Sequence, residues 1–297
     1  MMKPIERILV ADDFSPSSEE ALQAASYLAQ QVKGKLTVLH VVSQTPFDGH
    51  FFGPVNIELV NQIEKKASEE LAARVSSKIK QTEGVAIQVN VGVPFVDIVR
   101  YARQQKIQFV VVGSHGKEDL ERILLGSVAE NIIRTSECPV WMQRGVFSIP
   151  KKILLLTDLS QNARAGFHLG LFLAKLFGAA VHLLHVFEPS YVPSFAMIDT
   201  TEHELKMKEM VKEEFQKWVE EAHLSKVELK TELLEGSVKT KLEEVFKKEK
   251  FDAVVMSTHG RSALFHKHLG SLTTHVARHA PCSLISVRPD GFRFKEI

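Results

Sequence analysis

The hydrophobic residues of this chain fall into two patterns that alternate from one end of the sequence to the other. Short apolar runs have the length and composition of buried strands, and between them apolar residues recur at helical spacing. Ala21, Ala25, Leu28 and Val32 form one such helical stripe, and another runs between residues 60 and 79. Strands that alternate with helices predict a parallel α/β sheet, Rossmann-like, with helices on both faces. In the first half the predicted strands are 8–11, 36–42, 85–91, 109–112 and 139–142.

The same order of patterns occurs a second time, and matching residues keep a nearly constant separation. Asp158 follows Asp13 by 145 residues (158 − 13), and Cys282 follows Cys138 by 144 (282 − 138). A register this constant predicts a tandem duplication. The connection between the halves is short, so we expect them to pack together rather than to be loosely tethered. The predicted domains are 1–147 and 148–297.

Polar or small residues follow two of the predicted strands in each half. In the first half these are Asp13, after strand one, and the stretch from Gly113 to Gly116, after strand four. Ligands of open parallel sheets bind beyond the carboxyl ends of strands, at the point where the strand order reverses. We therefore expect strands one and four to be neighbours at that point.

The stretch after strand four carries the clearest chemistry. Gly113 and Gly116 follow the apolar run, and nine residues after Gly116 come Gly126 and Ser127, which precede a helical pattern. Glycines allow backbone N–H groups to approach a ligand, and a helix N-terminus favours an anion, so the pattern indicates a phosphate ester. A capping box between Ser127 and Glu130 is the alternative interpretation. The stretch is not a P-loop, because no Gly-Lys-Ser/Thr follows the glycines.

These spacings resemble the Gly-x2-Gly-x9-Gly-Ser/Thr motif of nucleotide-binding members of the universal stress protein family. The first half matches the motif completely, whereas the second half has Ser257 in place of the first glycine. The resemblance covers nearly the whole chain, twice. Further matching positions are Asp13, His40-Val41, Gly92 and Cys138-Pro139 in the first half, and Asp158, His185-Val186, Gly236 and Cys282 in the second.

The resemblance implies a five-stranded parallel α/β sandwich with strand order 3-2-1-4-5 in each half. Single-domain members of the family dimerise through strand five. In this chain residues 140–142 are therefore expected to pair with residues 284–287 and to form an intramolecular pseudo-dimer. Whether two chains then associate as a homodimer is left open.

The resemblance also implies an adenine nucleotide, ATP or AMP, as the ligand. The aspartate and the backbone around Ala11 and Val41 would contact adenine or ribose, and the glycine loop and Ser127 would hold the phosphates. Asp13 or Asp158 could hold Mg²⁺ through water. The first-site residues are Ala11, Asp13, Val41, Gly113, Ser114, His115, Gly116, Gly126, Ser127, Val128 and Ala129. Those of a second site are Leu156, Asp158, Val186, Ser257, His259, Gly260, Arg261, Gly270, Ser271 and Leu272.

Two features of the second half give opposite indications about whether it binds a nucleotide. Ser257 would be strained by about 1 kcal/mol or more if the position required a positive φ, and its side chain would crowd a ligand if the backbone approached closely. Residues 117–125 carry a net charge of −1, whereas residues 261–269 carry +2, which favours a triphosphate in the second half. We expect nucleotide in the first site and leave the second open.

The composition narrows the possible partners and compartments. The formal net charge of +1 gives no global field to recruit nucleic acid or an acidic membrane. No run of about 18 apolar residues occurs, which predicts that nothing spans a bilayer. Residues 1–7 lack the apolar core of a signal peptide, and two cysteines indicate a reducing compartment. The expected location is the cytoplasm.

Three functions are compatible with these patterns. The first is an ATP- or AMP-binding sensor or adaptor of the stress response, acting on protein partners. The second is a non-catalytic scaffold that binds an apolar ligand or a partner through aromatic loops. The third is a slow ATP-hydrolysing enzyme, for which one aspartate beside a phosphate loop is thin support. The aromatic residues behind the second function are Phe47, Phe51, Phe52, Tyr191 and Phe195.

Three pairs of residues receive structural interpretations. His275 and His279 have the spacing of a helical zinc pair, but no third ligand is evident, so a plain pair is expected. His40 and the matching His185 are expected to be histidines with satisfied hydrogen bonds. Cys138 and Cys282 are expected to pack as small apolar residues rather than to do redox chemistry.

Overall fold

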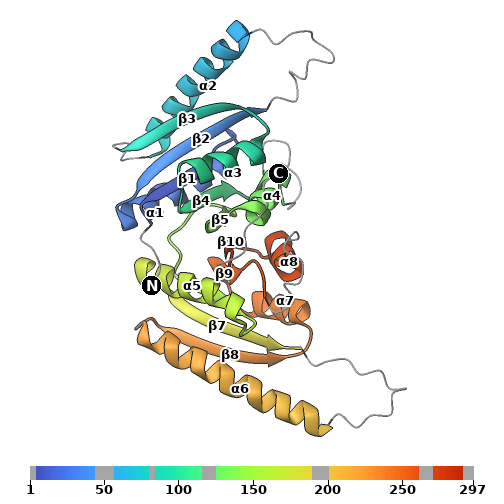
Figure 1. Cartoon of the computed structure of the whole chain (residues 1–297). Coiled ribbons are helices and arrows are strands. Elements are labelled where there is room, and N and C mark those ends of the chain that lie inside the picture. The colour runs from blue at the N-terminus through green and yellow to red at the C-terminus, as the bar shows by residue number, and fades with distance from the viewer. Residues whose placement is uncertain are drawn as a thin grey trace, which may run out of the picture.

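The two halves of the chain form one continuous sheet. The computed structural model describes residues 5–43, 57–79, 84–115, 125–188, 201–260 and 270–289. Ten strands are ordered β3-β2-β1-β4-β5-β10-β9-β6-β7-β8. Each half therefore has the predicted order 3-2-1-4-5, and strands one and four are neighbours where the order reverses. Figure 1 shows the halves end to end, with α2 at one end of the molecule and α6 at the other.

Within each half, all strand pairs are parallel and are linked by helices. The first half consists of β1 (Arg7–Ala11), α1 (Pro16–Val32), β2 (Lys35–Ser43), α2 (Ile57–Lys78), β3 (Val85–Gly92), α3 (Pro94–Gln104), β4 (Phe109–Gly113), α4 (Ser127–Thr135) and β5 (Val140–Gln143). The second consists of β6 (Lys152–Thr157), a short 3-10 helix η2 (Gln161–Ala163), α5 (Arg164–Phe177), β7 (Ala180–Phe187), α6 (Thr201–Leu224), β8 (Leu229–Glu235), α7 (Val238–Lys248), β9 (Ala253–Ser257), α8 (Ser271–His279) and β10 (Ser283–Val287).

The halves join through their fifth strands. β5 and β10 pair antiparallel, with Trp141 opposite Ile285 and Met142 opposite Leu284. Trp141 is 1% exposed, and its ring lies 6.3 Å from that of Phe147, in the connection between the halves. The predicted intramolecular pseudo-dimer is therefore confirmed.

Helices cover both faces of the sheet. Successive residues of a strand point to opposite faces, and in these strands both sets of residues are largely apolar, so both faces must be buried. α1, α2, α5 and α6 pack on one face, where Val10 and Val111 belong to the core. α3, α4, α7 and α8 pack on the other, with Leu9 and Val110. The apolar stripe predicted for residues 60–79 is buried only toward its C-terminal end, at Leu71, Val75 and Ile79.

Local signals explain where the two helices after the first strands begin and end. Ser15 caps α1 by accepting a hydrogen bond from the Ser18 N–H, and Pro16 has the fixed φ that suits a first helical position. Lys33 and the matching Gly178 both end their helices in the left-handed conformation, with φ of 54° and 65°. Glycine adopts this conformation without steric cost, whereas lysine does so at some expense.

Two predictions about composition can be compared with the fold. Among the described residues, no helix has both the length and the apolar character that a bilayer-spanning segment needs. Both cysteines are free thiols: Cys282 is buried and Cys138 is partly so. They pack against the α3, α4, α7 and α8 core, as expected for small apolar residues.

Candidate functional site

A cavity of about 540 Å³ lies at the carboxyl ends of β1, β2 and β4. Its walls come from the β1–α1 connection, the end of β2, the start of α3 and the first turn of α4. Of the predicted first-site residues it brings together Ala11, Asp13, Val41, Gly113, His115, Gly126, Ser127, Val128 and Ala129. Ser114 is buried beside it rather than in its lining, and Gly116 lies outside the described residues.

A matching cavity of about 310 Å³ lies at the same place in the second half. Both volumes fall within or near the range of small-molecule sites. The second cavity brings together the predicted residues Leu156, Asp158, Val186, Ser257, His259, Gly260, Gly270, Ser271 and Leu272. Arg261 and the rest of the basic loop, residues 262–269, lie outside the described residues.

The described residues that flank the glycine loop make matching contacts in the two halves. After β4, the Ser114 N–H donates to the Gln143 carbonyl, and the Gly126 N–H donates back to the Ser114 carbonyl, at 2.9 and 2.8 Å. The Ser114 hydroxyl lies 2.8 Å from Nδ1 of His115. In the second half Thr258 and His259 make the same contact at 2.8 Å. Ser114 is thereby bonded both to the neighbouring strand β5 and to Gly126.

The first turn of α4 faces the first cavity. Gly126 is the N-cap and has no side chain to cap the helix, and Ser127 is the first helical residue. The capping-box alternative, with Ser127 as the cap, is therefore wrong. The first backbone N–H groups of a helix have no partner within it and carry the positive end of the helix dipole. Because Ser127, Val128 and Ala129 line the cavity, this end of α4 can bind an anion.

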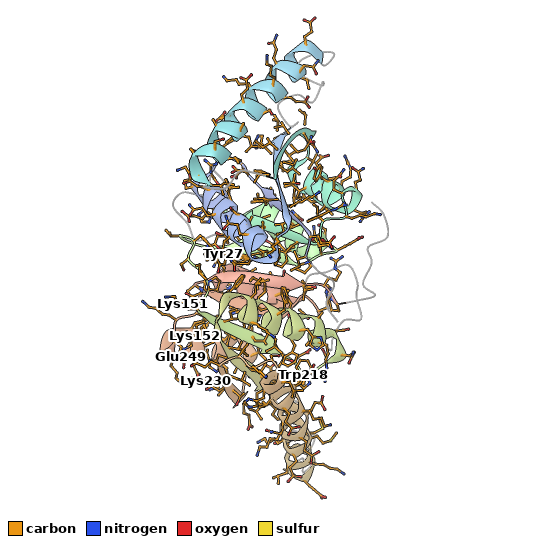
Figure 2. All side chains as sticks on the ribbon, turned by 90° about the vertical axis from the view of Figure 1, so that its left-hand side faces the viewer. Tyr27, Lys151, Lys152, Trp218, Lys230 and Glu249 are labelled. Carbon is orange, nitrogen blue, oxygen red and sulfur yellow. The ribbon has the colours of Figure 1, made fainter. Side chains whose placement is uncertain are left out.

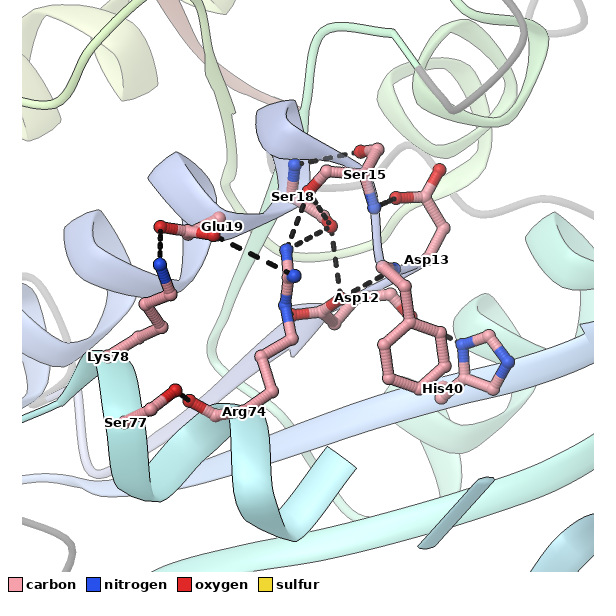
Figure 3. A network of polar contacts seen from close by, with 10 residues as sticks. Asp12, Asp13, Ser15, Ser18, Glu19, His40, Arg74, Ser77 and Lys78 are labelled. Atoms are coloured by element: carbon pink, nitrogen blue, oxygen red, sulfur yellow. Dashed lines mark hydrogen bonds and ion pairs between the residues drawn. The ribbon is translucent and has the colours of Figure 1, made fainter. Parts of the chain in front are cut away.

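The β1–α1 connection places two carboxylates at the cavity in different ways (Figure 3). Asp13 Oδ1 accepts the Ser15 N–H at 3.0 Å. Asp12, which the sequence interpretation missed, has a fully buried side chain that pairs with Arg74 at 3.0 Å. The only signal for Asp12 was its place beside Asp13; its partner lies 62 residues away (74 − 12).

Histidines at the ends of β2 and β7 hold the backbone of the neighbouring strands. His40 Nδ1 lies 2.7 Å from the Asp12 carbonyl oxygen, and His185 Nδ1 lies 2.8 Å from that of Thr157. The prediction of satisfied histidines is confirmed for these contacts. Further cavity residues that the sequence interpretation did not name are Ser18, Leu39, Val42, Ser43, Pro94, Ile98 and Val112.

A sequence model of the universal stress protein family matches residues 4–144 and again residues 150–288. The chain belongs to the universal stress protein family. A universal stress protein of Methanocaldococcus jannaschii is 35% identical over 137 residues, which cover 46% of this chain and 79% of that protein. One from Mycolicibacterium smegmatis is 25% identical over 291 residues and covers 95% of this chain and 97% of its own length.

Solved structures support the same fold. The crystal structure of a universal stress protein from Archaeoglobus fulgidus covers 96% of this chain and 99% of its own, with a TM-score of 0.65 and 21% identity. One from Pseudomonas aeruginosa covers 97% and 95%, with a TM-score of 0.67 and 17% identity. At these identities the likeness concerns the fold alone.

The second half of this universal stress protein accommodates Ser257 without the two problems expected from the sequence. Gly113, the matching residue, is not among the described glycines with positive φ, so the strain argument is wrong. Ser257 is on the strand face that packs on α5, and its hydroxyl accepts the Gly166 N–H at 2.9 Å. The serine is therefore bonded to a helix rather than crowding a ligand.

Further features distinguish the second cavity from the first. The Asn162 side-chain amide donates to the Gly260 carbonyl at 3.0 Å. Gly260 is so close to Asp158 that a Cβ at the glycine would lie 2.0 Å from its Oδ2. Glu188 also lines this cavity, where the first half has Ser43 (188 − 145).

The described residues contain no cluster of three or more histidine, cysteine, aspartate or glutamate side chains that could hold a metal ion. His275 and His279 stack with ring centroids 4.5 Å apart, and His279 Nδ1 lies 2.9 Å from the His275 carbonyl. These contacts are those of the plain helical pair expected from the sequence.

Proposed function

We propose that the first half of this universal stress protein binds an adenine nucleotide, ATP or AMP, in the cavity at the carboxyl ends of β1, β2 and β4. The observation that carries the proposal is that the described residues of the Gly-x2-Gly-x9-Gly-Ser motif lie at that cavity. Gly113, Gly126 and Ser127 line it, and the N-terminal turn of α4 faces it. Backbone N–H groups at such a turn bind phosphate without a positively charged side chain.

The two ends of the nucleotide would lie against different walls of the cavity. Asp13 and the main chain around Ala11 and Val41 form the wall on the β1–β2 side, where adenine and ribose would lie. Gly113, His115 and the first turn of α4 form the β4 side, where the phosphates would lie. Mg²⁺, if it accompanies ATP, would be held mainly by the phosphates, with Asp13 as the available carboxylate.

The second half is the weaker candidate for the nucleotide. Its cavity has a little over half the volume of the first, about 310 against 540 Å³. Glu188 lines it where the first cavity has Ser43, and this carboxylate opposes a phosphate ligand, whereas Asp12 of the first cavity is paired with Arg74. Asn162 holds Gly260 in place. We propose that the chain binds one nucleotide.

Nucleotide occupancy would stabilise one arrangement of the first half, as any ligand of the folded state does. This is the basis of a role as a cytoplasmic sensor or adaptor in stress survival, with protein partners that read the occupied state. The proposal does not require turnover of ATP.

Two measurements test the proposal. In isothermal titration with ATP we expect a stoichiometry near one per chain. In thermal unfolding, ATP at about 100 times its dissociation constant should add about 2.7 kcal/mol to the free energy of unfolding and raise the midpoint.

Matched variants decide which half binds. Gly126→Val should abolish the ATP-dependent rise, whereas the corresponding Gly270→Val should leave it. Loss of binding with Gly270→Val alone would reverse the assignment of the halves. Absence of any shift with the wild-type chain at millimolar ATP would reject the nucleotide proposal.

A further inference from the structure

Arg74, near the C-terminal end of α2, contacts the β1–α1 connection at two points and the first turns of α1 at a third (Figure 3). Its Nε donates to Oδ2 of Asp12 at 3.0 Å, and its Nη2 donates to the Ser15 carbonyl at 2.6 Å. Its Nη1 lies 3.7 Å from Oε2 of Glu19. A planar guanidinium can serve three acceptors at once, which the single ammonium of a lysine does less well.

The carboxylate that Arg74 holds is itself the support of the turn that carries Asp13. Asp12 Oδ1 accepts the Phe14 N–H at 2.7 Å and the Ser18 hydroxyl at 3.0 Å. Phe14 has a φ of 63°, a left-handed conformation that is costly for a residue with a Cβ. Its ring lies 4.5 Å from that of His40. Asp12 therefore stabilises a strained turn at the edge of the first cavity.

The second half builds the same turn without an ion pair. Thr157 replaces Asp12 (157 − 145), and its hydroxyl accepts the Leu159 N–H at 3.0 Å. Leu159, with a φ of 61°, matches Phe14.

The partner helix also changes in the second half. Trp218 of α6 stands at the position of Arg74 (218 − 144), and its ring lies 4.4 Å from the guanidinium carbon of Arg164. The turn itself thus does not require the charges, and the Asp12–Arg74 pair is a feature of the first half alone.

The Asp12–Arg74 pair lies beside the first cavity. Asp12, Asp13 and Ser18 all line the first cavity, whereas Arg74 stands behind them on the α1–α2 face. We propose that Arg74 is a positioning residue for nucleotide binding by the first half: by holding Asp12 it fixes the turn that presents Asp13. This inference rests on the proposed function. It links the docking of α2 to the ligand site through one side chain.

The primary test compares two cations of the same helix. Arg74→Met removes the contact with Asp12, whereas the control Lys78→Met removes a cation that pairs with Glu19 at 2.6 Å. At a temperature where both variants are folded, Arg74→Met should weaken ATP binding by about tenfold or more, since a hydrogen bond to a charged group is lost. Lys78→Met should stay within about twofold of the wild type, as expected for a more exposed pair.

A second readout needs no nucleotide. Hydrogen exchange of the Phe14 and Ser18 amides reports how firmly the turn is held, because exchange follows local opening. Arg74→Met should speed exchange at these amides, Arg74→Lys should do so less, and Lys78→Met should leave it unchanged. If wild-type chain binds no ATP, the proposed function fails, yet this exchange result still decides whether Arg74 positions the turn.

A double variant protects the test against simple unfolding. Asp12→Thr together with Arg74→Trp transplants the residues of the second half, so no buried carboxylate is left without a counter-charge. We expect this variant to fold and to exchange its Phe14 and Ser18 amides within about threefold of the wild-type rate, because the turn is again supported. The inference is overturned if Arg74→Met binds ATP like the wild type, or if the double variant folds but exchanges these amides as fast as Arg74→Met.

Discussion

Arg144 and Arg288 stand at matching positions (288 − 144 = 144), and each guanidinium donates to carbonyl groups at the C-terminal end of a helix in the opposite half. Arg144 Nη2 donates to the Ala277 carbonyl of α8 at 2.7 Å. Arg288 Nη2 donates to the Arg134 carbonyl of α4. A helix C-terminus carries a partial negative charge, so a cation is favoured there. The antiparallel β5–β10 junction is thus reinforced from both sides.

Breaking this reciprocal contact should destabilise the whole chain. Arg288 is buried and Arg144 is half-buried, and burial lowers the pKa of both guanidinium groups. Arg144→Met leaves carbonyls of α8 without their donor and should lower the free energy of unfolding by about 1.5–3 kcal/mol. Urea unfolding followed by circular dichroism measures this change.

The control for that prediction crosses the same junction at the surface. Arg278 pairs with Glu130 at 2.9 Å, with 53% of the arginine side chain exposed. Arg278→Met should therefore cost about 0–1 kcal/mol. Equal losses for Arg144→Met and Arg278→Met would mean that burial of Arg144 adds nothing to the junction.

Gly113 is required by close packing, and its replacement should damage the first half. A Cβ at Gly113 would lie 2.7 Å from Oγ of Ser17 and 2.8 Å from its carbonyl carbon. Gly113→Ser should therefore push the start of α1 away from β4 and cost about 1–3 kcal/mol. It should also abolish the ATP-dependent rise in the unfolding midpoint, because the same residue lines the first cavity.

The opposite change in the second half provides the comparison. Ser257→Gly removes the hydrogen bond to the Gly166 N–H but introduces no clash, so we expect a loss of about 1 kcal/mol. ATP binding should be unchanged. If Gly113→Ser is as mild as Ser257→Gly, the crowding at Ser17 is relieved by a small shift and the packing argument fails.

Much of this fold could be predicted from the sequence because its signals are local and occur twice. Apolar periodicity located the strands and most helices, and the constant offset between residues such as Asp13 and Asp158 revealed the duplication. The family resemblance then supplied the strand order and the pairing of β5 with β10, which periodicity alone does not determine. Both follow from the family fold and are confirmed.

The parts that could not be predicted depend on contacts between distant segments. The pairing of Asp12 with Arg74 joins two elements, and nothing in the spacing of either residue indicates it. Ser257 was misread because the motif alone does not tell which face of β9 the side chain occupies; Gly166 decides that. The aromatic loops and most of the loops between the motif glycines lie outside the described residues, so the predictions about them stay predictions.

The two thiols should be inert in the folded protein. Burial raises the pKa of Cys138 to about 11 and that of Cys282 to about 12. Since the thiolate is the reactive form, an aromatic disulfide reagent at about pH 8 should label neither residue until the chain unfolds. Labelling in urea, where both should react, is the control. Rapid labelling of either thiol under native conditions would contradict the buried apolar role.

Stability in acid should depend on a group of charges near the amino ends of β6 and β8, where Lys152, Lys230 and Glu249 lie together (Figure 2). Hydrogen bonds from Lys230 and Lys152 lower the pKa of Glu249 to about 2 from an ordinary value of 4.5. Burial, with Lys230 nearby, lowers the pKa of His182 below its ordinary value of 6.5. In both cases the folded state binds fewer protons than the unfolded state as the pH falls.

The sign of the pH effect follows from these two shifts. A lowered pKa gives stability that is fully present above the ordinary value and is lost as the pH falls through the folded value. The free energy of unfolding should therefore begin to fall below pH 6.5, from His182, and fall further between 4.5 and about 2, from Glu249. Glu249→Gln should flatten the second part of this curve. Glu235→Gln, which removes an exposed partner of Lys208, should leave it as steep as in the wild type. An unchanged slope with Glu249→Gln would show that the two lysines do not hold that carboxylate in the folded chain.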